Sequence, residues 1–418
     1  MKKEATAVLT AAKKLWTNGP LWNALGSTMY GVNSLLLLVL VSRACGVETA
    51  GVFGISFTTA QLLFFVGLFG ANHYQMTDYA GKYSFSAYAR LKRLSSALAA
   101  ACCALTVWLL GFTWEKAALT ALLTLYMLAH SLGELYQSQM FQKGRLDLSG
   151  KSTFFRTLAS FVCFTTVLAL TRSVYAACAA LLVSSVAGLW LWAARPARAF
   201  VSGLSAERLE VSRLARECAP IFLSVFLANL ILNAPKYAIE YFWTDDVQGV
   251  FSMIFMPAPV INLMGGFLFM PLLSRISRVV EARDTGGLRG LMGRQALAVT
   301  GLTAICALGA WAVGPEALGL LYGTGLTAYR LPLVLVILGG GALAYCQLLY
   351  YVLVILRRQR LILRCHLAVG AVAVLLSVPL VSGQAVMGAA AAFVAAHALL
   401  LGMYLWALAR AWKEKLNA

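Results

Sequence analysis

The chain is short of charge, and above all of acidic residues. Asp and Glu together number 16, against 34 Lys and Arg, and charged residues make up only 12% of the sequence. A hydrophobic content of 61% and a mean hydropathy of +0.78 exclude a soluble globular domain. Since there is no soluble domain to carry a basic stripe, the net charge of +18 indicates contact with anionic lipid rather than with nucleic acid.

Motifs that carry common enzyme chemistry are also missing. The sequence has no G-x-x-x-x-G-K-[ST] phosphate loop, no H-E-x-x-H zinc motif and no G-x-S-x-G elbow. Its nine cysteines show no C-x-x-C or Cys/His metal spacing. No outer loop is longer than about twenty residues, which leaves no room for a catalytic domain. We therefore expect neither an enzyme nor a bound metal or cofactor.

Long apolar runs are abundant, and about twelve of them approach the twenty or so residues that cross a bilayer. They cover residues 21–42, 50–71, 94–112, 117–139, 152–170, 174–194, 219–241, 250–273, 296–313, 331–356, 362–381 and 386–409. Most basic residues fall in alternate loops and at the two termini, which places both termini on the cytoplasmic side. The sequence predicts an all-α polytopic membrane protein, N-in and C-in.

A basic, less apolar segment at 195–217 divides these runs into two groups of six. We predict an N-terminal half at 1–200, a cytoplasmic linker at 201–217 and a C-terminal half at 218–418. A short echo supports a duplication: Gly51-Val-Phe recurs as Gly249-Val-Phe, 198 residues later. Six spans per half predict two bundles related by a pseudo-twofold axis along the membrane normal, with a ligand cavity between them near mid-depth.

The seventh run carries polar groups where lipid disfavours them. At i, i+4, i+7 and i+11 of one helical face stand Asn229, Asn233, Lys236 and Glu240. Ionisable groups at membrane depth cost about 2.5–3.5 kcal/mol each, so they usually face a bundle interior or an aqueous cavity. We interpret the stripe as the wet face of a cavity-lining helix. The alternatives are that Lys236 snorkels to the headgroups or pairs with Glu240.

Two further runs carry polar faces. The first run has Asn23, Ser27 and Tyr30 at the same spacing, which fits either a second wet face or hydrogen bonds between helices. Arg43 at its outer end is either interfacial or placed to meet an anionic group.

In the fourth run, Glu134 shares a face with Tyr126, His130 and Gln137. Glu134 is either a candidate for ion or proton coupling or a structural group near the interface. Arg156 is either its partner or a phosphate contact.

Several short motifs resemble one family. They are Val41-Ser42-Arg43-Ala-Cys-Gly46 with Ala50-Gly51-Val52-Phe53, Tyr74-Gln75-Met-Thr-Asp78, and Asn233-Ala-Pro235-Lys236-Tyr237. With twelve spans in two halves, the chain resembles the Wzx-like oligosaccharide flippases of the multidrug/oligosaccharidyl-lipid/polysaccharide exporter superfamily. The resemblance implies transfer of a polyprenyl-diphosphate-linked oligosaccharide across the cytoplasmic (inner) membrane for envelope polysaccharide synthesis. Partners would be that lipid-linked oligosaccharide, membrane lipid, and glycosyltransferases and a polymerase of the pathway.

A diphosphate cannot cross the hydrocarbon core unless its charge is compensated, so such a carrier needs buried cations and hydrogen-bonding groups. The expected cations are Lys236, Arg43 and Arg156; the expected sugar-binding groups are Asn229, Asn233, Asn23, Ser27 and Tyr30. Rocking of the halves would give alternating access, with Glu134 or Glu240 titrating. Two alternatives stay open: a cation-coupled multidrug exporter of the same superfamily, which would use those two carboxylates, and a non-transporting membrane scaffold for polysaccharide assembly enzymes.

Overall fold

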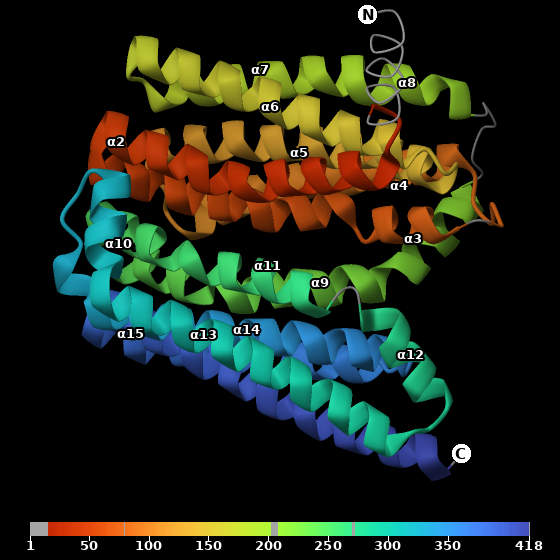
Figure 1. The fold of residues 1–418 in the computed structure, drawn as a ribbon. Helices are drawn as coiled ribbons and strands as arrows, with labels where there is room; N and C mark the ends of the chain where they lie inside the picture. Colours follow the sequence, from red (N-terminus) through yellow and green to blue (C-terminus); the bar gives the residue numbers. More distant parts are fainter. Residues whose placement is uncertain (1–15, 79, 202–207, 270–271, 418) are drawn as a thin grey trace, which may run out of the picture. The chain divides into compact units, whose positions relative to one another are not determined.

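A computed structural model of the chain describes residues 16–78, 80–201, 208–269 and 272–417, and all regular elements in these ranges are helices (Figure 1). The helices of the first part are α2 (Gly19–Leu68), α3 (Ala71–Thr77), α4 (Phe85–Leu109), α5 (Trp114–Gln142), α6 (Leu146–Thr171), α7 (Val174–Gly188), η1 (Leu189–Ala194), α8 (Arg195–Ala197) and η2 (Arg198–Phe200). They are followed by α9 (Arg208–Phe242), α10 (Asp245–Phe255), α11 (Pro257–Phe269), α12 (Leu273–Glu281), α13 (Thr285–Tyr322), η4 (Thr327–Tyr329), α14 (Arg330–Ile355) and α15 (Gln359–Asn417).

The expected membrane spans are present. Ten helical stretches of the described residues are long and apolar enough to cross a bilayer. Two of them are bent pairs: α2 bends at Gly46, where φ is 89°, and α15 bends at Gln384 and Ala385. With each pair counted as two spans, the described residues hold about twelve, which confirms the predicted all-helical polytopic fold.

One helix begins earlier than its apolar run. The apolar run covers residues 94–112, whereas α4 begins at Phe85 and includes Arg90, Lys92 and Arg93. Ser84 caps its N-terminus, because the Ser84 hydroxyl accepts a hydrogen bond from the Ala87 amide at 3.2 Å. A hydropathy window stops at basic residues, but the helix does not.

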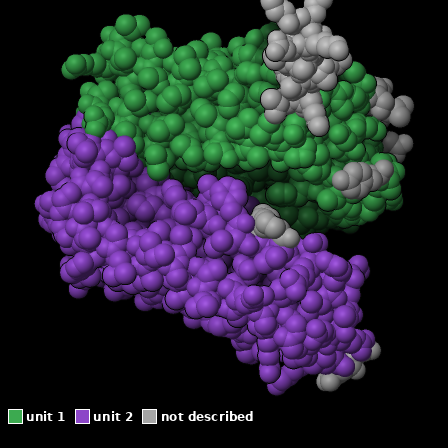
Figure 2. Space-filling view, in the orientation of Figure 1, with its two compact units in different colours: residues 1–45, 56–222 green, residues 46–55, 223–418 purple. Residues whose placement is uncertain are grey.

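The chain divides into two compact units. Unit 1 comprises residues 1–45 and 56–222, and unit 2 comprises residues 46–55 and 223–418 (Figure 2). The expected halves and linker stay a prediction. Residues 208–217 of that linker form the first turns of α9, and residues 202–207 lie outside the described residues.

Each unit is built around one central helix. In unit 1, α5 contacts α3, α4, α6 and α7, and 67% of its apolar stretch is buried. In unit 2, α14 contacts α10, α11, α13 and α15, and 56% of its apolar stretch is buried. The central helices are the fourth and the tenth spans, so they hold equivalent places in the two sets of six.

Two segments of unit 2 cross at glycines, and the crossing is reciprocal. A Cβ added to Gly51 would overlap the Asp245 carbonyl and lie 2.9 Å from the Gly249 amide. A Cβ added to Gly249 would overlap the Val47 carbonyl and lie 3.2 Å from the Gly51 amide. The paired positions are 198 residues apart, the interval of the sequence echo. Residue i meeting j while j meets i is the signature of a local twofold axis.

This crossing leaves no room for a methyl group at either glycine. We expect Gly249→Ala to lower the free energy of unfolding by about 1–3 kcal/mol, because the backbones must separate to admit the Cβ. The measurement is the thermal midpoint of the purified protein in detergent. Gly266→Ala is the matched control, since a Cβ there meets nothing within 4 Å. Equal midpoints for the two variants would contradict the close crossing.

Candidate functional site

Unit 1 contains a fully buried arginine. Arg156, on α6, is 0% exposed. Its guanidinium occupies the space where Gly133 of α5 lacks a side chain, and its stem packs at Gly188, the last residue of α7. A Cβ on Gly133 would overlap the guanidinium, and one on Gly188 would lie 2.8 Å from Cγ of Arg156. Three helices of unit 1 therefore hold this cation in place.

Polar groups of α5 surround the guanidinium. Nη2 of Arg156 lies 3.1 Å from Nδ1 of His130, and because guanidinium can only donate, His130 accepts at Nδ1. With its amide oriented to satisfy both ends, Gln137 accepts from Nη2 at 3.1 Å and donates to Oε1 of Glu134 at 3.0 Å. The predicted neighbours Arg156 and Glu134 are thus linked through Gln137.

Helix α2 adds Tyr30 and Asn33 to this cluster, beside Tyr126 of α5. The Tyr30 ring lies 5.3 Å from the His130 ring, and the Tyr126 ring lies 4.9 Å from it. Asn33 is buried and its amide donates to the Tyr126 hydroxyl at 3.4 Å. Of the polar face expected on the first span, Tyr30 therefore joins the site, whereas Asn23 and Ser27 are exposed.

A second buried cation, Lys92 of α4, was missed in the sequence. It is 1% exposed, and within the described residues its Nζ has no hydrogen-bond partner. Glu134, a half-buried carboxylate of α5, interacts electrostatically with both Lys92 and Arg156. The signal was available, because Tyr88, Lys92 and Ser95 repeat at i, i+4 and i+7 on the buried face of α4.

The polar loop after the second span is held by its own bonds. Asp78 accepts from the amides of Lys82 at 2.8 Å and Tyr83 at 3.1 Å, and from the Tyr88 hydroxyl at 3.0 Å. Lys82 binds Glu217 of α9 at 2.7 Å, and this hydrogen-bonded carboxylate raises the pKa of Lys82. The Asp78 bonds therefore fix the conformation of the loop, and the Lys82–Glu217 ion pair attaches it to the first turns of α9.

Unit 2 buries one cation of the predicted stripe. Lys236 of α9 is 7% exposed, and its Nζ lies 4.4 Å from the centre of the Phe255 ring of α10. A cation over an aromatic face is stabilised by the ring quadrupole. The amide of Asn233 donates to the Asn229 carbonyl at 3.0 Å, and that of Asn229 to the Val225 carbonyl at 2.9 Å. Both amide nitrogens therefore bond within α9 itself.

The remaining predicted residues lie at the ends of their spans. Arg43 is exposed three residues before the bend at Gly46. Glu240 is half-buried one turn after Lys236 on α9. The structure thus gathers Tyr30, Glu134 and Arg156 in unit 1, and keeps the α9 residues together in unit 2. Their roles in binding and coupling stay predictions.

A buried polar chain in unit 2 was not anticipated. His366 of α15 lies 2.9 Å from the Ser224 hydroxyl through Nδ1 and 2.6 Å from the Tyr404 hydroxyl through Nε2. Tyr404 belongs to the hydrophobic core of the unit, and His366 is 3% exposed. Each ring nitrogen has a hydroxyl partner, so the chain ties α9 to both parts of α15 as a structural element.

Comparison with solved structures identifies the fold. No protein-family model and no curated protein matches this chain. The fold is that of the multidrug/oligosaccharidyl-lipid/polysaccharide (MOP) superfamily of membrane transporters. The lipid II flippase MurJ, in an inward closed conformation, is similar over 94% of this chain and 89% of its own, with a TM-score of 0.72 and 12% identity.

Two transporters of the MATE family share the fold, and one of them is described as a multidrug resistance transporter. An inward-facing one gives a TM-score of 0.70 at 13% identity and covers 92% of this chain and 96% of its own. The Vibrio cholerae transporter VcmN, in its bent form, gives 0.61 at 16% identity, with 98% of each chain covered. At these identities the similarity establishes the fold, and the narrower resemblance to Wzx-like flippases stays a prediction.

The contact between Arg156 and Gly133 can be tested by a double-mutant cycle. We expect Gly133→Ala to lower the free energy of unfolding by about 1–3 kcal/mol, because the methyl group and the guanidinium need the same space. Arg156→Met removes the guanidinium, so Gly133→Ala should cost less in that background, with a coupling energy of about 1 kcal/mol or more. Thermal unfolding in detergent measures each variant.

Gly31→Ala is the control for this cycle, because Gly31 is exposed on α2 and a Cβ there meets nothing within 4 Å. Additive effects of Gly133→Ala and Arg156→Met would show that the two positions do not compete for space.

Proposed function

We propose that this chain is a flippase that moves a polyprenyl-diphosphate-linked oligosaccharide from the inner to the outer leaflet of the cytoplasmic membrane, for envelope polysaccharide synthesis. The observation that carries the proposal is the excess of buried cations over carboxylates. Arg156, Lys92 and Lys236 are 0%, 1% and 7% exposed. Such charges cost free energy inside a membrane protein, so those that are present usually mark a substrate or ion route.

The chemistry of the buried groups suits an anionic lipid. Guanidinium and ammonium groups are the donors that proteins use for phosphate oxygens. In unit 1, Nε and Nη1 of Arg156 and Nζ of Lys92 have no hydrogen-bond partner within the described residues. Buried donors without acceptors cost free energy, and phosphate oxygens would supply the missing acceptors. The Tyr30 hydroxyl and the Asn229 and Asn233 side chains are the proposed contacts for sugar hydroxyls.

Similarity of fold is compatible with this substrate class. MurJ is described as a lipid II flippase, and it shares the fold over most of both chains. We propose the same type of movement here, alternating access, with Glu134 or Glu240 as the coupling group. The lipid-linked oligosaccharide, the surrounding lipid and the glycosyltransferases and polymerase of the pathway are the proposed partners.

The second candidate function is multidrug export, and Glu134 is the observation that favours it. This carboxylate is half-buried in a span, where a cation antiporter would need an acidic group. A transporter of the same fold is described as a multidrug resistance transporter of the MATE family. Against it, the charge of Glu134 is already shared by Lys92 and Arg156. We therefore rank the flippase first.

The flippase proposal predicts that loss of a buried cation lowers transport without lowering the amount of protein in the membrane. Lys236→Met and Lys92→Met should each lower delivery of lipid-linked oligosaccharide roughly ten- to hundredfold, the equivalent of one charged hydrogen bond. The measurement is surface polysaccharide in a flippase-deficient host, at equal membrane abundance of the variants. Lys143→Met is the matched control, because Lys143 is exposed. Full complementation by Lys236→Met would exclude that residue from the site.

The two candidate functions differ in what they predict for dye export and for the role of Glu134 in it. If the chain is a flippase, its expression should not lower accumulation of a cationic dye in a host that lacks multidrug exporters, and Glu134→Gln should change nothing in that assay. Dye export by the wild-type chain that Glu134→Gln abolishes would replace the flippase with an antiporter. A scaffold would support polysaccharide synthesis equally well with Lys236→Met and Lys92→Met.

A further inference from the structure

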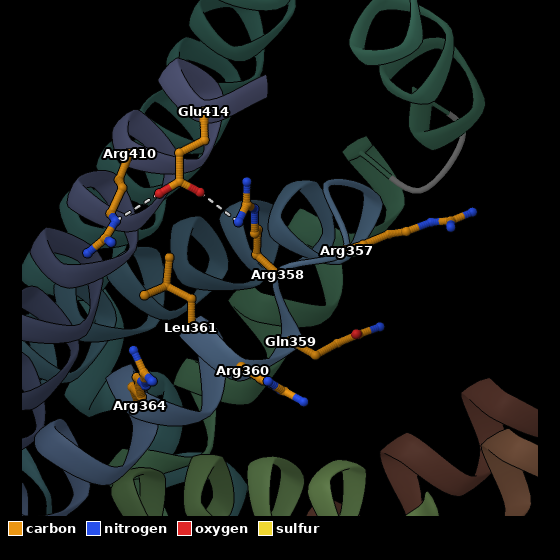
Figure 3. Close-up of a pocket in the computed structure, with 8 residues that line it drawn as sticks. All are labelled: Arg357, Arg358, Gln359, Arg360, Leu361, Arg364, Arg410 and Glu414. Carbon is orange, nitrogen blue, oxygen red and sulfur yellow. Dashed lines mark hydrogen bonds and ion pairs between the residues drawn. The ribbon is translucent and has the colours of Figure 1, made fainter. Parts of the chain in front are cut away.

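An arginine-lined pocket lies in unit 2, where the turn between α14 and α15 meets the end of α15 (Figure 3). Its volume is about 370 Å³. The lining includes five arginines and one carboxylate: Arg357, Arg358, Arg360, Arg364, Arg410 and Glu414. None of these residues belongs to the buried clusters proposed for transport, so the pocket is a separate feature.

The carboxylate neutralises only part of this charge. Oε2 of Glu414 lies 2.6 Å from Nη1 of Arg358, and Oε1 lies 3.0 Å from Nε of Arg410. Figure 3 shows Arg357 and Arg360 extending away from this ion-paired group. Arg357, Arg360 and Arg364 are exposed, and the pocket lining offers them no second carboxylate. The pocket therefore has a surplus of guanidinium groups, which favours a ligand with phosphate oxygens.

A separate, shallow apolar groove lies on α15, and its lining residue Trp406 precedes the pocket residue Arg410 by about one turn. It has a volume of about 430 Å³ and is lined by Ala398, Leu399, Gly402, Met403 and Trp406. Leu399, Gly402 and Trp406 share a helical face with Arg410 and Glu414, because they follow one another at intervals of three or four residues. The guanidinium of Arg410 lies 5.8 Å from the centre of the Trp406 ring, so the groove and the pocket adjoin at these two side chains.

We propose that the pocket and the groove together bind one anionic phospholipid. The phosphate would occupy the arginine pocket and an acyl chain would lie in the groove over Gly402. A soluble anion would need only the pocket, whereas a phospholipid needs a charged end beside an apolar one. Tryptophan at such a boundary is typical of the level where headgroups meet acyl chains. The basic residues place this end of the chain on the cytoplasmic side, where anionic lipid attracts basic pockets.

The direct test is lipid binding to the purified full-length chain in a neutral detergent. Phosphatidylglycerol should bind and raise the thermal midpoint with concentration, whereas phosphatidylcholine with the same acyl chains should not. Arg360→Gln/Arg364→Gln should weaken phosphatidylglycerol binding about thirtyfold. The matched control is Arg289→Gln/Arg294→Gln, which removes two exposed arginines of α13. Equal weakening by the two double variants would overturn the proposal.

A second variant tests the groove separately from the charge. Gly402→Leu places a side chain in the open space of the groove and should weaken phosphatidylglycerol binding about tenfold. Gly309→Leu is its control, since Gly309 is exposed and a Cβ there meets nothing within 4 Å. Inorganic pyrophosphate serves as the soluble probe. If pyrophosphate binds as tightly as phosphatidylglycerol and Gly402→Leu has no effect on either, the pocket holds a free anion and the lipid proposal fails.

Discussion

Hydrocarbon offers no hydrogen-bond partner to a backbone amide or carbonyl, and this constraint decides the form of the whole chain. The described residues satisfy it by running as helix after helix, with bends at Gly46 and at Ala385 where the chain reverses. Once the backbone is satisfied within each helix, only side chains can distinguish one helix face from another. The functional content of the molecule is therefore carried by the few side chains that break the apolar pattern.

A buried charge is the most costly departure from that apolar pattern, and the chain has its buried charges at a few places in each unit. In unit 1, Arg156 and Lys92 share the charge of Glu134, and the guanidinium is held at Gly133 by shape as well as by hydrogen bonds. In unit 2, Lys236 is placed over the Phe255 ring. Replacing such groups with apolar ones often leaves a fold as stable or more stable, so folding alone gives no reason to keep them.

Much of the fold could be predicted from the sequence, because span number follows from hydropathy alone. The site was only partly accessible. Lys92 lies just outside the apolar run at 94–112, since such a run ends where basic residues begin, although the helix continues through them. Periodicity grouped Asn229 and Asn233 on one face but could not show that both amide nitrogens donate to carbonyls of their own helix. The contact between Gly133 and the Arg156 guanidinium depends on how α5, α6 and α7 pack together, and no local sequence pattern encodes that packing.

The glycine crossing in unit 2 has a consequence for the origin of the chain. The contacts of Gly51 and Gly249 are interchangeable: each meets the counterpart of what the other meets. Two identical half-length chains would make the same crossing at a homodimer interface, so the contact fits an origin of the two halves by duplication. At both positions the crossing leaves room for glycine alone, because a Cβ on either segment would displace the backbone of the other.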